Sequence, residues 1–222
     1  MKAGFFGGPS GPFWIASSDA SDTATDATCS ATITPPTGTQ VGDLLVLFIA
    51  TGATNSGGAP TISVAPSWDA LLDSASGGAT GATSYAAYSR VYQSGDSGGW
   101  TIEATDAYSM VGCIQTARNA TAIGNSRETT GTVNTASEIA STTAGSMLFV
   151  FAGGTAGNTD TPSFDTGPTE TTFAEAKLAS SSNYKARLWA GYEERIAGGA
   201  TGTRTFTSTN VDYWDAFLVE IT

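Results

Sequence analysis

Histidine is absent from the sequence. It is the residue that most often acts as a general base and the commonest protein ligand of zinc and iron. Its absence also excludes Ser-His-Asp and Cys-His catalytic arrangements. Only two cysteines are present, which is too few for a cysteine-rich metal site. We therefore predict a protein that is not an enzyme, with no catalytic residues, no metal ion and no cofactor.

Charged residues are also scarce, at 13% of the 222 residues, and most of them are acidic. Nine Lys and Arg against 20 Asp and Glu give a net charge of −11. Nucleic-acid binding needs clustered cations, and anionic membranes attract basic segments, so neither partner is expected. The longest apolar run, Leu44 to Ala50, is too short to span a membrane. Lys2 is followed by residues too rich in Gly and Pro for a secretory signal.

The two cysteines are Cys29 and Cys113. Cys113 lies in the apolar run Met110-Val111-Gly112-Cys113-Ile114, which favours a buried free thiol that behaves as a small apolar side chain. A Cys29–Cys113 disulfide remains an alternative, because the sequence does not contain the geometry that decides it.

The residues that are abundant indicate an all-β fold. Gly occurs 27 times, and Ser and Thr supply most of the polar residues in place of Lys and Glu. Thr suits the half-buried surface of a sheet, whereas Gly, Ser and Asn suit turns. The scarcity of Lys and Glu disfavours a helical protein, since these residues usually cover helix surfaces.

The chain contains an internal repeat. Residues 42–48 (GDLLVLF) align with residues 145–151 (GSMLFVF) at an offset of 103. Further matches pair Ala86, Tyr88 and Tyr92 with Ala186, Leu188 and Tyr192 at an offset of 100, Ile102 with Phe206, and Ile114 with Val219 at an offset of 105. Such self-similarity indicates two copies of one unit, and we assign them to residues 28–127 and 128–222.

Alternation with a period of two predicts five strands in each copy. In the first copy they are residues 28–34, 44–50, 85–92, 100–105 and 109–116, and in the second 132–140, 147–152, 184–193, 203–208 and 214–221. The continuous apolar runs 44–50 and 147–152 predict strands buried on both faces. Residues 170–180 are assigned to a strand, with a short helical turn as the alternative. We predict a jelly-roll-like antiparallel β-sandwich with an internal pseudo-twofold repeat; two tandem Ig-like sandwiches are the alternative.

Residues 1–27 are interpreted as an N-terminal arm, because Gly and Pro interrupt the segment repeatedly. Large apolar residues at Phe5, Phe6, Phe13 and Trp14 are unusual for a free tail. We expect the arm to pack on its own body or on a neighbouring subunit. These four aromatic residues are the candidate anchors of that interface, since buried aromatic side chains dominate such contacts.

Four short motifs follow one another along the chain: Pro35-Pro36-Thr37-Gly38-Thr39-Gln40-Val41-Gly42-Asp43-Leu44-Leu45-Val46, Pro66-Ser67-Trp68, Pro168-Thr169-Glu170 and Gly202-Thr203-Arg204-Thr205. In this order they resemble the motifs of a family of tailed-phage and prophage structural proteins, and the first is similar to the opening of that family. The resemblance covers residues 30 to 222. It implies a jelly-roll-like sandwich with a role on the particle surface or in a tail fibre, and it brings no catalytic residues.

The leading hypothesis is therefore a phage virion structural protein, either a capsid decoration (cement) protein or a tail-fibre component. It would be assembled in the host cytoplasm, lie on the virion surface, and bind other capsid or tail proteins and further copies of itself. A homo-oligomer is expected, with a trimer suggested by analogy.

Two alternatives belong to other classes. A glycan- or receptor-binding module would carry a site for a host-surface glycan at its loop tips. A glycan hydrolase would need two carboxyl groups across a cleft, for which Asp69 with Asp73 or Asp212 with Asp215 are candidates. A further acidic cluster, Asp19, Asp22 and Asp26, lacks the spacing of an EF-hand calcium loop and is interpreted as solvated surface.

Overall fold

The computed structural model describes residues 11–26, 28–53, 61–64, 68–76, 83–131, 135–136, 138–156, 163–164, 168–177, 185–207 and 211–222. In these residues the chain forms strands and a short 3₁₀ turn, Asp96–Gly98, which confirms the all-β class. The strands are β1 (Phe13–Thr23), β2 (Thr28–Ile33), β3 (Leu44–Ala53), β4 (Thr61–Val64), β5 (Asp69–Ser76), β6 (Thr83–Val91), β7 (Trp100–Thr105), β8 (Ala107–Arg118), β9 (Ile123–Gly131), β10 (Thr135–Ala136), β11 (Ser146–Ala156), β12 (Ser163–Phe164), β13 (Thr169–Lys177), β14 (Lys185–Arg195), β15 (Arg204–Thr207) and β16 (Val211–Ile221).

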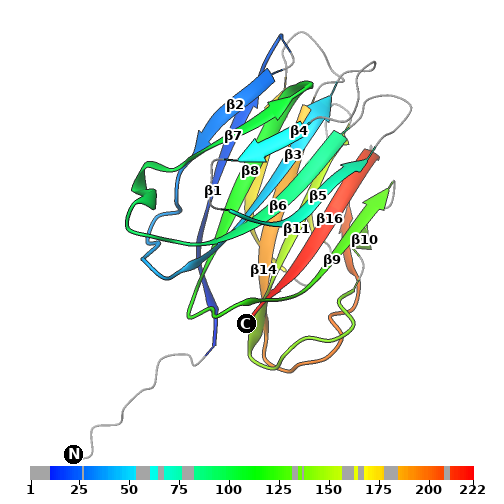
Figure 1. The fold of residues 1–222 in the computed structure, drawn as a ribbon. Coiled ribbons are helices and arrows are strands. Elements are labelled where there is room, and N and C mark those ends of the chain that lie inside the picture. Colours follow the sequence, from blue (N-terminus) through cyan, green and yellow to red (C-terminus); the bar gives the residue numbers. More distant parts are fainter. Residues whose placement is uncertain are drawn as a thin grey trace, which may run out of the picture.

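The described strands form antiparallel sheets of two sizes (Figure 1). The first five-stranded sheet has the order β1-β8-β3-β6-β5, and the second, read from its other edge, has the order β9-β16-β11-β14-β13. The three-stranded sheets have the orders β2-β7-β4 and β10-β15-β12. Each strand of the first half thus has a counterpart eight places later in the chain. The strand order of the second half is that of the first.

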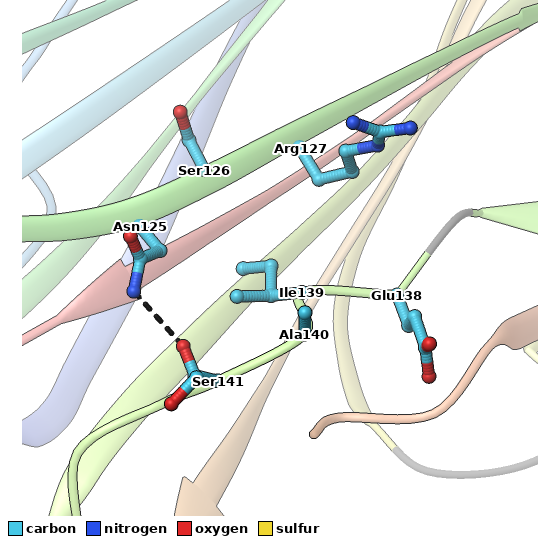
Figure 2. Close-up of a pocket in the computed structure, with 7 residues that line it drawn as sticks. All are labelled: Asn125, Ser126, Arg127, Glu138, Ile139, Ala140 and Ser141. Carbon is cyan, nitrogen blue, oxygen red and sulfur yellow. Dashed lines mark hydrogen bonds between the residues drawn. The ribbon is translucent and has the colours of Figure 1, made fainter. Parts of the chain in front are cut away.

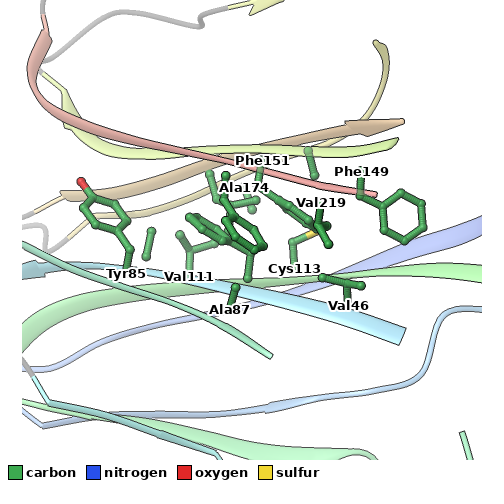
Figure 3. Packing of buried hydrophobic residues seen from close by; sticks show 14 of the residues in the cluster. Val46, Tyr85, Ala87, Val111, Cys113, Phe149, Phe151, Ala174 and Val219 are labelled. Atoms are coloured by element: carbon green, nitrogen blue, oxygen red, sulfur yellow. The ribbon is translucent and has the colours of Figure 1, made fainter. Parts of the chain in front are cut away.

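Three apolar cores lie between these sheets. The central core lies between the two five-stranded sheets (Figure 3). In it Phe48 stacks on Phe151 with ring centroids 5.3 Å apart. An outer core packs the first five-stranded sheet on β2-β7-β4 through Leu47 and Ile102, among others. A second outer core packs the other five-stranded sheet on the segment around Ile139. The result is a β-sandwich in layers, in which both five-stranded sheets are covered on both faces.

The alternation along β3 explains this layering. Leu44, Val46 and Phe48 belong to the central core, whereas Leu45 and Leu47 between them belong to an outer core. Successive side chains of a strand point to opposite faces, so an unbroken apolar run covers both. The prediction that residues 44–50 and 147–152 are buried on both faces is confirmed. Residues 169–177 form a strand, as preferred over a helical turn.

Two of the repeat alignments made from the sequence are wrong. The register pairs Leu47 with Tyr88 and Val150 with Gly191, so β6 corresponds to β14 at an offset of 103 rather than 100. In the same way Leu47 pairs with Ile114 and Val150 with Leu218, so β8 corresponds to β16 at an offset of 104 rather than 105. Both errors are slips by an odd number of residues. Such a slip exchanges the two faces of a strand, while a strand buried on both faces offers no polar side to reveal it.

The N-terminal boundary also changes. Residues 13–23, predicted as part of an arm outside the sandwich, form the edge strand β1 and pair with β8 of the same chain from Phe13 to Thr23. The stretch rich in Gly and Pro stops just before this strand. The second half of the strand is polar because it lies at a sheet edge that faces solvent. The sequence of the segment therefore lacks the apolar pattern of a buried strand. The predicted division between residues 127 and 128 falls inside β9.

The cysteines are both free and buried. Cys113 lies in the central core and Cys29 in the outer core beneath β2-β7-β4, so the first five-stranded sheet separates them. The alternative of a Cys29–Cys113 disulfide is therefore wrong. Burial, followed by the negative charge of Asp22, raises the pKa of the Cys29 thiol to about 12. Burial likewise raises the pKa of Cys113.

Candidate interaction surfaces

A shallow hollow of about 320 Å³ lies where the described chain begins, and we call it the base hollow. Its lining residues are Gly11, Pro12, Phe13, Gly145, Ser146, Glu194, Arg195 and Ile196. Gly11 packs directly on the backbone of Gly145, because a side chain at position 11 would approach the Gly145 carbonyl oxygen to 2.5 Å. The side chain of Ile196 at this hollow is 87% exposed. The hollow thus combines the start of β1 with a large, uncovered apolar side chain.

Trp14, beside the base hollow, has partners within its own chain. Its ring stacks on Tyr192 of β14 at a centroid distance of 4.9 Å and an interplanar angle of 5°. Its Nε1 donates a hydrogen bond of 2.7 Å to Oε1 of Gln115, a fully buried residue of β8. Trp14 therefore joins β1 to the second five-stranded sheet and gives the buried Gln115 amide a donor.

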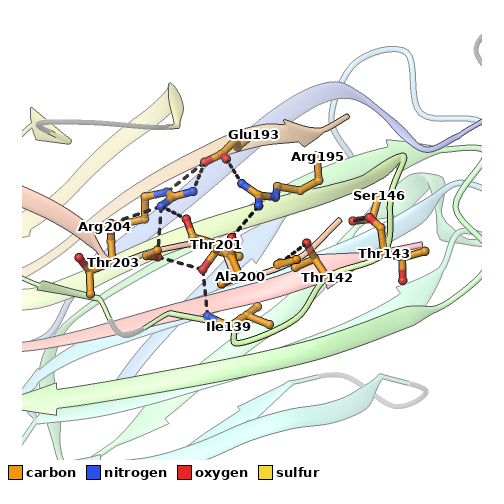
Figure 4. A network of polar contacts seen from close by, with 12 residues as sticks. Ile139, Thr142, Thr143, Ser146, Glu193, Arg195, Ala200, Thr201, Thr203 and Arg204 are labelled. Carbon is orange, nitrogen blue, oxygen red and sulfur yellow. Dashed lines mark hydrogen bonds and ion pairs between the residues drawn. The ribbon is translucent and has the colours of Figure 1, made fainter. Parts of the chain in front are cut away.

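A network of ion pairs holds the loop between β14 and β15 (Figure 4). Glu193 on β14 accepts hydrogen bonds from Arg195 at 2.7 Å and from Arg204 at 2.6 Å. Arg195 also donates to the carbonyl oxygen of Ala200 at 2.9 Å, and Arg204 donates to that of Thr201. The Glu193 and Arg204 side chains are 17% and 8% exposed, so solvent screens the pair little. The network fixes the end of β14 against the loop that leads into β15.

The first half has an ion pair at the corresponding place with the charges reversed. Arg90 lies opposite Leu45, as Glu193 lies opposite Leu148. Arg90 donates two hydrogen bonds, of 2.9 and 2.7 Å, to the carboxylate of Asp96 in the turn that follows β6. These hydrogen bonds from Arg90 lower the pKa of Asp96, although burial opposes the shift. An ion pair therefore ties β6 to the turn that follows it in the first half, and β14 to the first residue of β15 in the second.

A second hollow, of about 480 Å³, follows the outer edge of β9, and we call it the β9 groove (Figure 2). Asn125, Ser126, Arg127, Glu138, Ile139, Ala140 and Ser141 line it. β9 is the last strand of its sheet, so the N–H and C=O groups on its outer side face this groove rather than a strand. Asn125 donates a hydrogen bond of 2.9 Å to the Ser141 carbonyl oxygen at one end of the groove.

Glu220 supports that end of the groove from β16. Its carboxylate accepts hydrogen bonds from the backbone N–H groups of Thr143 and Asn125. Burial alone would raise the pKa of Glu220, but these hydrogen bonds outweigh it and lower the pKa. The carboxylate is therefore charged in the folded protein and holds the 139–143 segment beside β9.

The corresponding edge of the first half is closed. There β1 and β2 contact each other directly, with a hydrogen bond of 2.6 Å from the Ser18 hydroxyl to the Thr34 carbonyl oxygen. A second bond, of 2.8 Å, runs from the Ser30 backbone N–H to the Asp22 carboxylate. In the second half the described part of β10 is Thr135–Ala136, and the β9 groove lies between β9 and the segment 138–141.

The candidate residues named from the sequence are only partly brought together. Phe13 lines the base hollow and Trp14 stacks on Tyr192, whereas Phe5 and Phe6 lie outside the described residues. Asp19 and Asp22 lie along the edge strand β1. Within the described ranges, no group of three or more Asp, Glu or Cys lies close enough together to hold a metal ion.

One member of each predicted carboxyl pair has no described side chain, so the glycosidase alternative stays a prediction. The side chains of Asp73 and Asp212 lie outside the part of the chain whose side chains are described. Asp215 is fully buried, so in this structure it is out of reach of a sugar. Its carboxyl neighbour is Glu128 on β9, which the sequence analysis did not single out. Nothing in the sequence marks Glu128, because the pairing of β9 with β16 brings together residues 87 positions apart.

Exposed apolar side chains are few. Over the described ranges, the large hydrophobic residues that are strongly exposed are Val41, Val91 and Ile196, and none of them is aromatic. Trp100, Trp189 and Tyr85 are buried in the cores. Trp68, Tyr92 and Tyr108 are half-buried, so they keep part of their aromatic rings at the described surface.

The described residues include no helix with the length and apolar character needed to cross a membrane. Comparisons with protein-family models, with curated proteins and with solved structures found no match.

Proposed function

We propose that this chain is a structural protein of a tailed-phage particle, either a capsid decoration protein or a tail-fibre component, which acts by adhesion between subunits on the particle surface. The sequence resemblance over residues 30 to 222 motivates this assignment. The observation that carries it in the structure is the base hollow. Ile196 there is 87% exposed beside the start of β1, and burying such a side chain at an interface contributes about 1.5–3 kcal/mol.

The architecture suits such a role. In the first half one sheet contains β1-β8-β3-β6 and the other contains β2-β7-β4. In the second half the counterpart strands have the same orders. We infer that each half is a jelly-roll-like unit in which the fifth strand has joined the larger sheet, and that the two units arose by duplication. Packing through the central core makes a thick, rigid body, and rigid bodies lose little entropy when they assemble.

The proposal is tested on purified particles of the phage that encodes the protein. Quantitative mass spectrometry gives the copy number per particle, and immunogold labelling gives the position on head or tail. We expect a fixed copy number in intact particles. Absence of the protein from the particles refutes the assignment.

The base hollow is tested by a substitution. Ile196→Asp places a charge at the centre of the proposed contact and is expected to reduce incorporation and self-association measured by sedimentation velocity. Val41→Asp, which changes an apolar residue 67% exposed elsewhere, is the matched control and is expected to assemble normally. Equal incorporation of both variants would remove the base hollow from the proposed interface. The same sedimentation data test the proposed homo-oligomer and its trimeric state.

A further inference from the structure

A fully buried carboxyl group lies in the central core. Asp215 on β16 is opposite Gly153 of β11, and side chains of directly opposite residues share a face of the sheet. A side chain at position 153 would contact Ala50, Phe48 and Tyr85 of the first five-stranded sheet. The carboxyl group of Asp215 therefore faces the layer between the two five-stranded sheets.

The fold does not require an acid at this position. In the first half the corresponding residue is Val111, which lies opposite Ala50 and is buried in the same core. In the second half Asp215 takes the place of valine, and Gly153 is the counterpart of Ala50. Neither oxygen of Asp215 has a hydrogen-bond partner in the structure. A buried polar group without a partner lowers the stability of the fold, and a charged one lowers it more. An acid at this position is therefore unfavourable for stability.

The nearest carboxyl group belongs to the edge strand. Glu128 on β9 lies opposite Phe217, whose ring is in the central core, so Glu128 lies on the same face as Asp215. The Phe217–Glu128 pair is the next pair on that face after Asp215 and its partner on β9. Burial, followed by the negative charge of Glu128, raises the pKa of Asp215 to about 8. A carboxyl group in such a setting keeps its proton at neutral pH.

Other groups around Asp215 do not neutralise it. On β14 the side chains of Ala186 and Leu188 face the central core, so Lys185 and Arg187 at the alternate positions face away from it. From the first five-stranded sheet, Tyr85 on β6 faces this region, and its hydroxyl is uncharged. Over the described side chains, the charged group that faces Asp215 is therefore another acid.

We propose that Asp215 holds its proton beside Glu128 at the border of the central core, and that loss of this proton loosens β9 from the sheet. With the proton present, the Asp215 carboxyl group is neutral. Once Asp215 is ionised, its negative charge faces that of Glu128 beside apolar side chains, and the edge strand can relieve the repulsion by moving away. β9 also forms one wall of the β9 groove, so the edge strand and the groove become sensitive to pH. The inference does not depend on the proposed virion role.

The sign of the effect follows from the proton balance. A carboxyl group with a raised pKa in the folded state holds its proton where the unfolded chain has lost it. The stabilisation is therefore present at low pH and is lost as the pH rises toward the folded-state value. For a pKa of about 8, Asp215 alone is expected to raise the unfolding equilibrium constant about tenfold between pH 7 and pH 9. The raised pKa values of Cys29 and Cys113 add a further rise near pH 9, which every variant in the test shares.

The test compares the full-length protein with three variants in urea unfolding between pH 6 and pH 9.5. Asp215→Val installs the residue found in the first half and is expected to remove the tenfold pH dependence. Asp215→Asn provides the same test if the valine variant does not fold. Asp19→Asn changes the exposed first-half counterpart of Glu128 and is expected to keep the pH dependence of the unchanged protein. Equal pH dependence in the unchanged protein and both Asp215 variants overturns the proposal.

Hydrogen exchange followed by mass spectrometry locates the change. After correction for the intrinsic effect of pH, peptides from β9 are expected to lose about tenfold in protection between pH 7 and pH 9. Peptides from β1, the edge strand in the same place in the first half, are expected to keep theirs. An equal loss of protection in β9 and β1 would contradict a pH effect confined to β9. Stabilisation at pH 9 by calcium chloride that EDTA reverses also overturns it, because the pair would then be a cation site.

Discussion

Replacing Gly52 by alanine is expected to force apart the two five-stranded sheets. Gly52 lies on β3, in line with the residues that point into the central core. A Cβ atom there would be 2.7 Å from the backbone oxygen of Lys185 on β14 and 2.7 Å from the hydroxyl oxygen of Ser109. Real Cβ atoms almost never come so close to another atom. Ser109 can rotate, but the Lys185 carbonyl can retreat only if its whole strand moves.

The magnitude follows from two opposing effects. Overpacking a core costs about 1–3 kcal/mol. Replacing glycine by alanine also restricts the unfolded chain, which returns about 0.4–1 kcal/mol of stability where the backbone allows it. The net expectation is a destabilisation of about 1–2 kcal/mol, because the contact is with backbone. In a domain of this length it corresponds to a fall in Tm of about 2–8 °C.

Calorimetry and urea unfolding measure this change. Gly95→Ala is the matched control, since a Cβ at position 95 meets nothing within 4 Å and its φ of −85° suits any residue. The control should be neutral or slightly stabilised. Adding Ser109→Gly to Gly52→Ala should restore only part of the loss, because the Lys185 carbonyl remains. If Gly52→Ala is as stable as Gly95→Ala, the close approach of the sheets at Lys185 is refuted.

Three further outcomes follow from the contacts. Asp96→Asn should cost about 2–3 kcal/mol at pH 7 by weakening the bonds from Arg90, and urea unfolding should show the difference from the unchanged protein shrinking as pH falls through the lowered pKa of Asp96. Trp14→Phe keeps an aromatic ring but removes the Nε1–H group that donates to Oε1 of the buried Gln115, so a loss of about 0.5–1.5 kcal/mol is expected, whereas no measurable loss would contradict the 2.7 Å hydrogen bond. Both thiols should resist a disulfide-exchange reagent at pH 8 in the native protein and react fully in denaturant, and rapid native labelling would contradict their burial.

Some of this architecture is visible in the sequence because it depends on local patterns. Unbroken apolar runs at 44–50 and 147–152 predict strands buried on both faces, and the structure confirms it. The aligned glycines at Gly42 and Gly145 precede those runs, and both adopt positive φ, of 95° and 80°. A residue with a side chain is disfavoured in that conformation, so a glycine at this position in both halves has a physical cause.

Other parts depend on contacts between distant segments, which a local pattern does not contain. The edge strands β1 and β9 have one side toward solvent and polar sequences, so their apolar periodicity is weak. The candidate surfaces have the same limitation. The base hollow joins residues 11–13 to 145–146 and 194–196, three segments far apart in the chain. Asp215 is recognisable as unusual only after the register equates it with Val111.

The two reversed ion pairs show a contact that the two halves share but that a comparison of their residues does not reveal. At one strand end the first half has Arg90 with Asp96, and the second half has Glu193 with Arg204. A position-by-position comparison of the two halves scores Arg90 against Glu193 as a mismatch. The strand end needs a pair that ties it to the following loop, and either polarity provides the same attraction between partly buried groups. The two halves therefore share an ion pair at this strand end but not the residues that form it, so they are better compared by the contacts at each position than by residue identity.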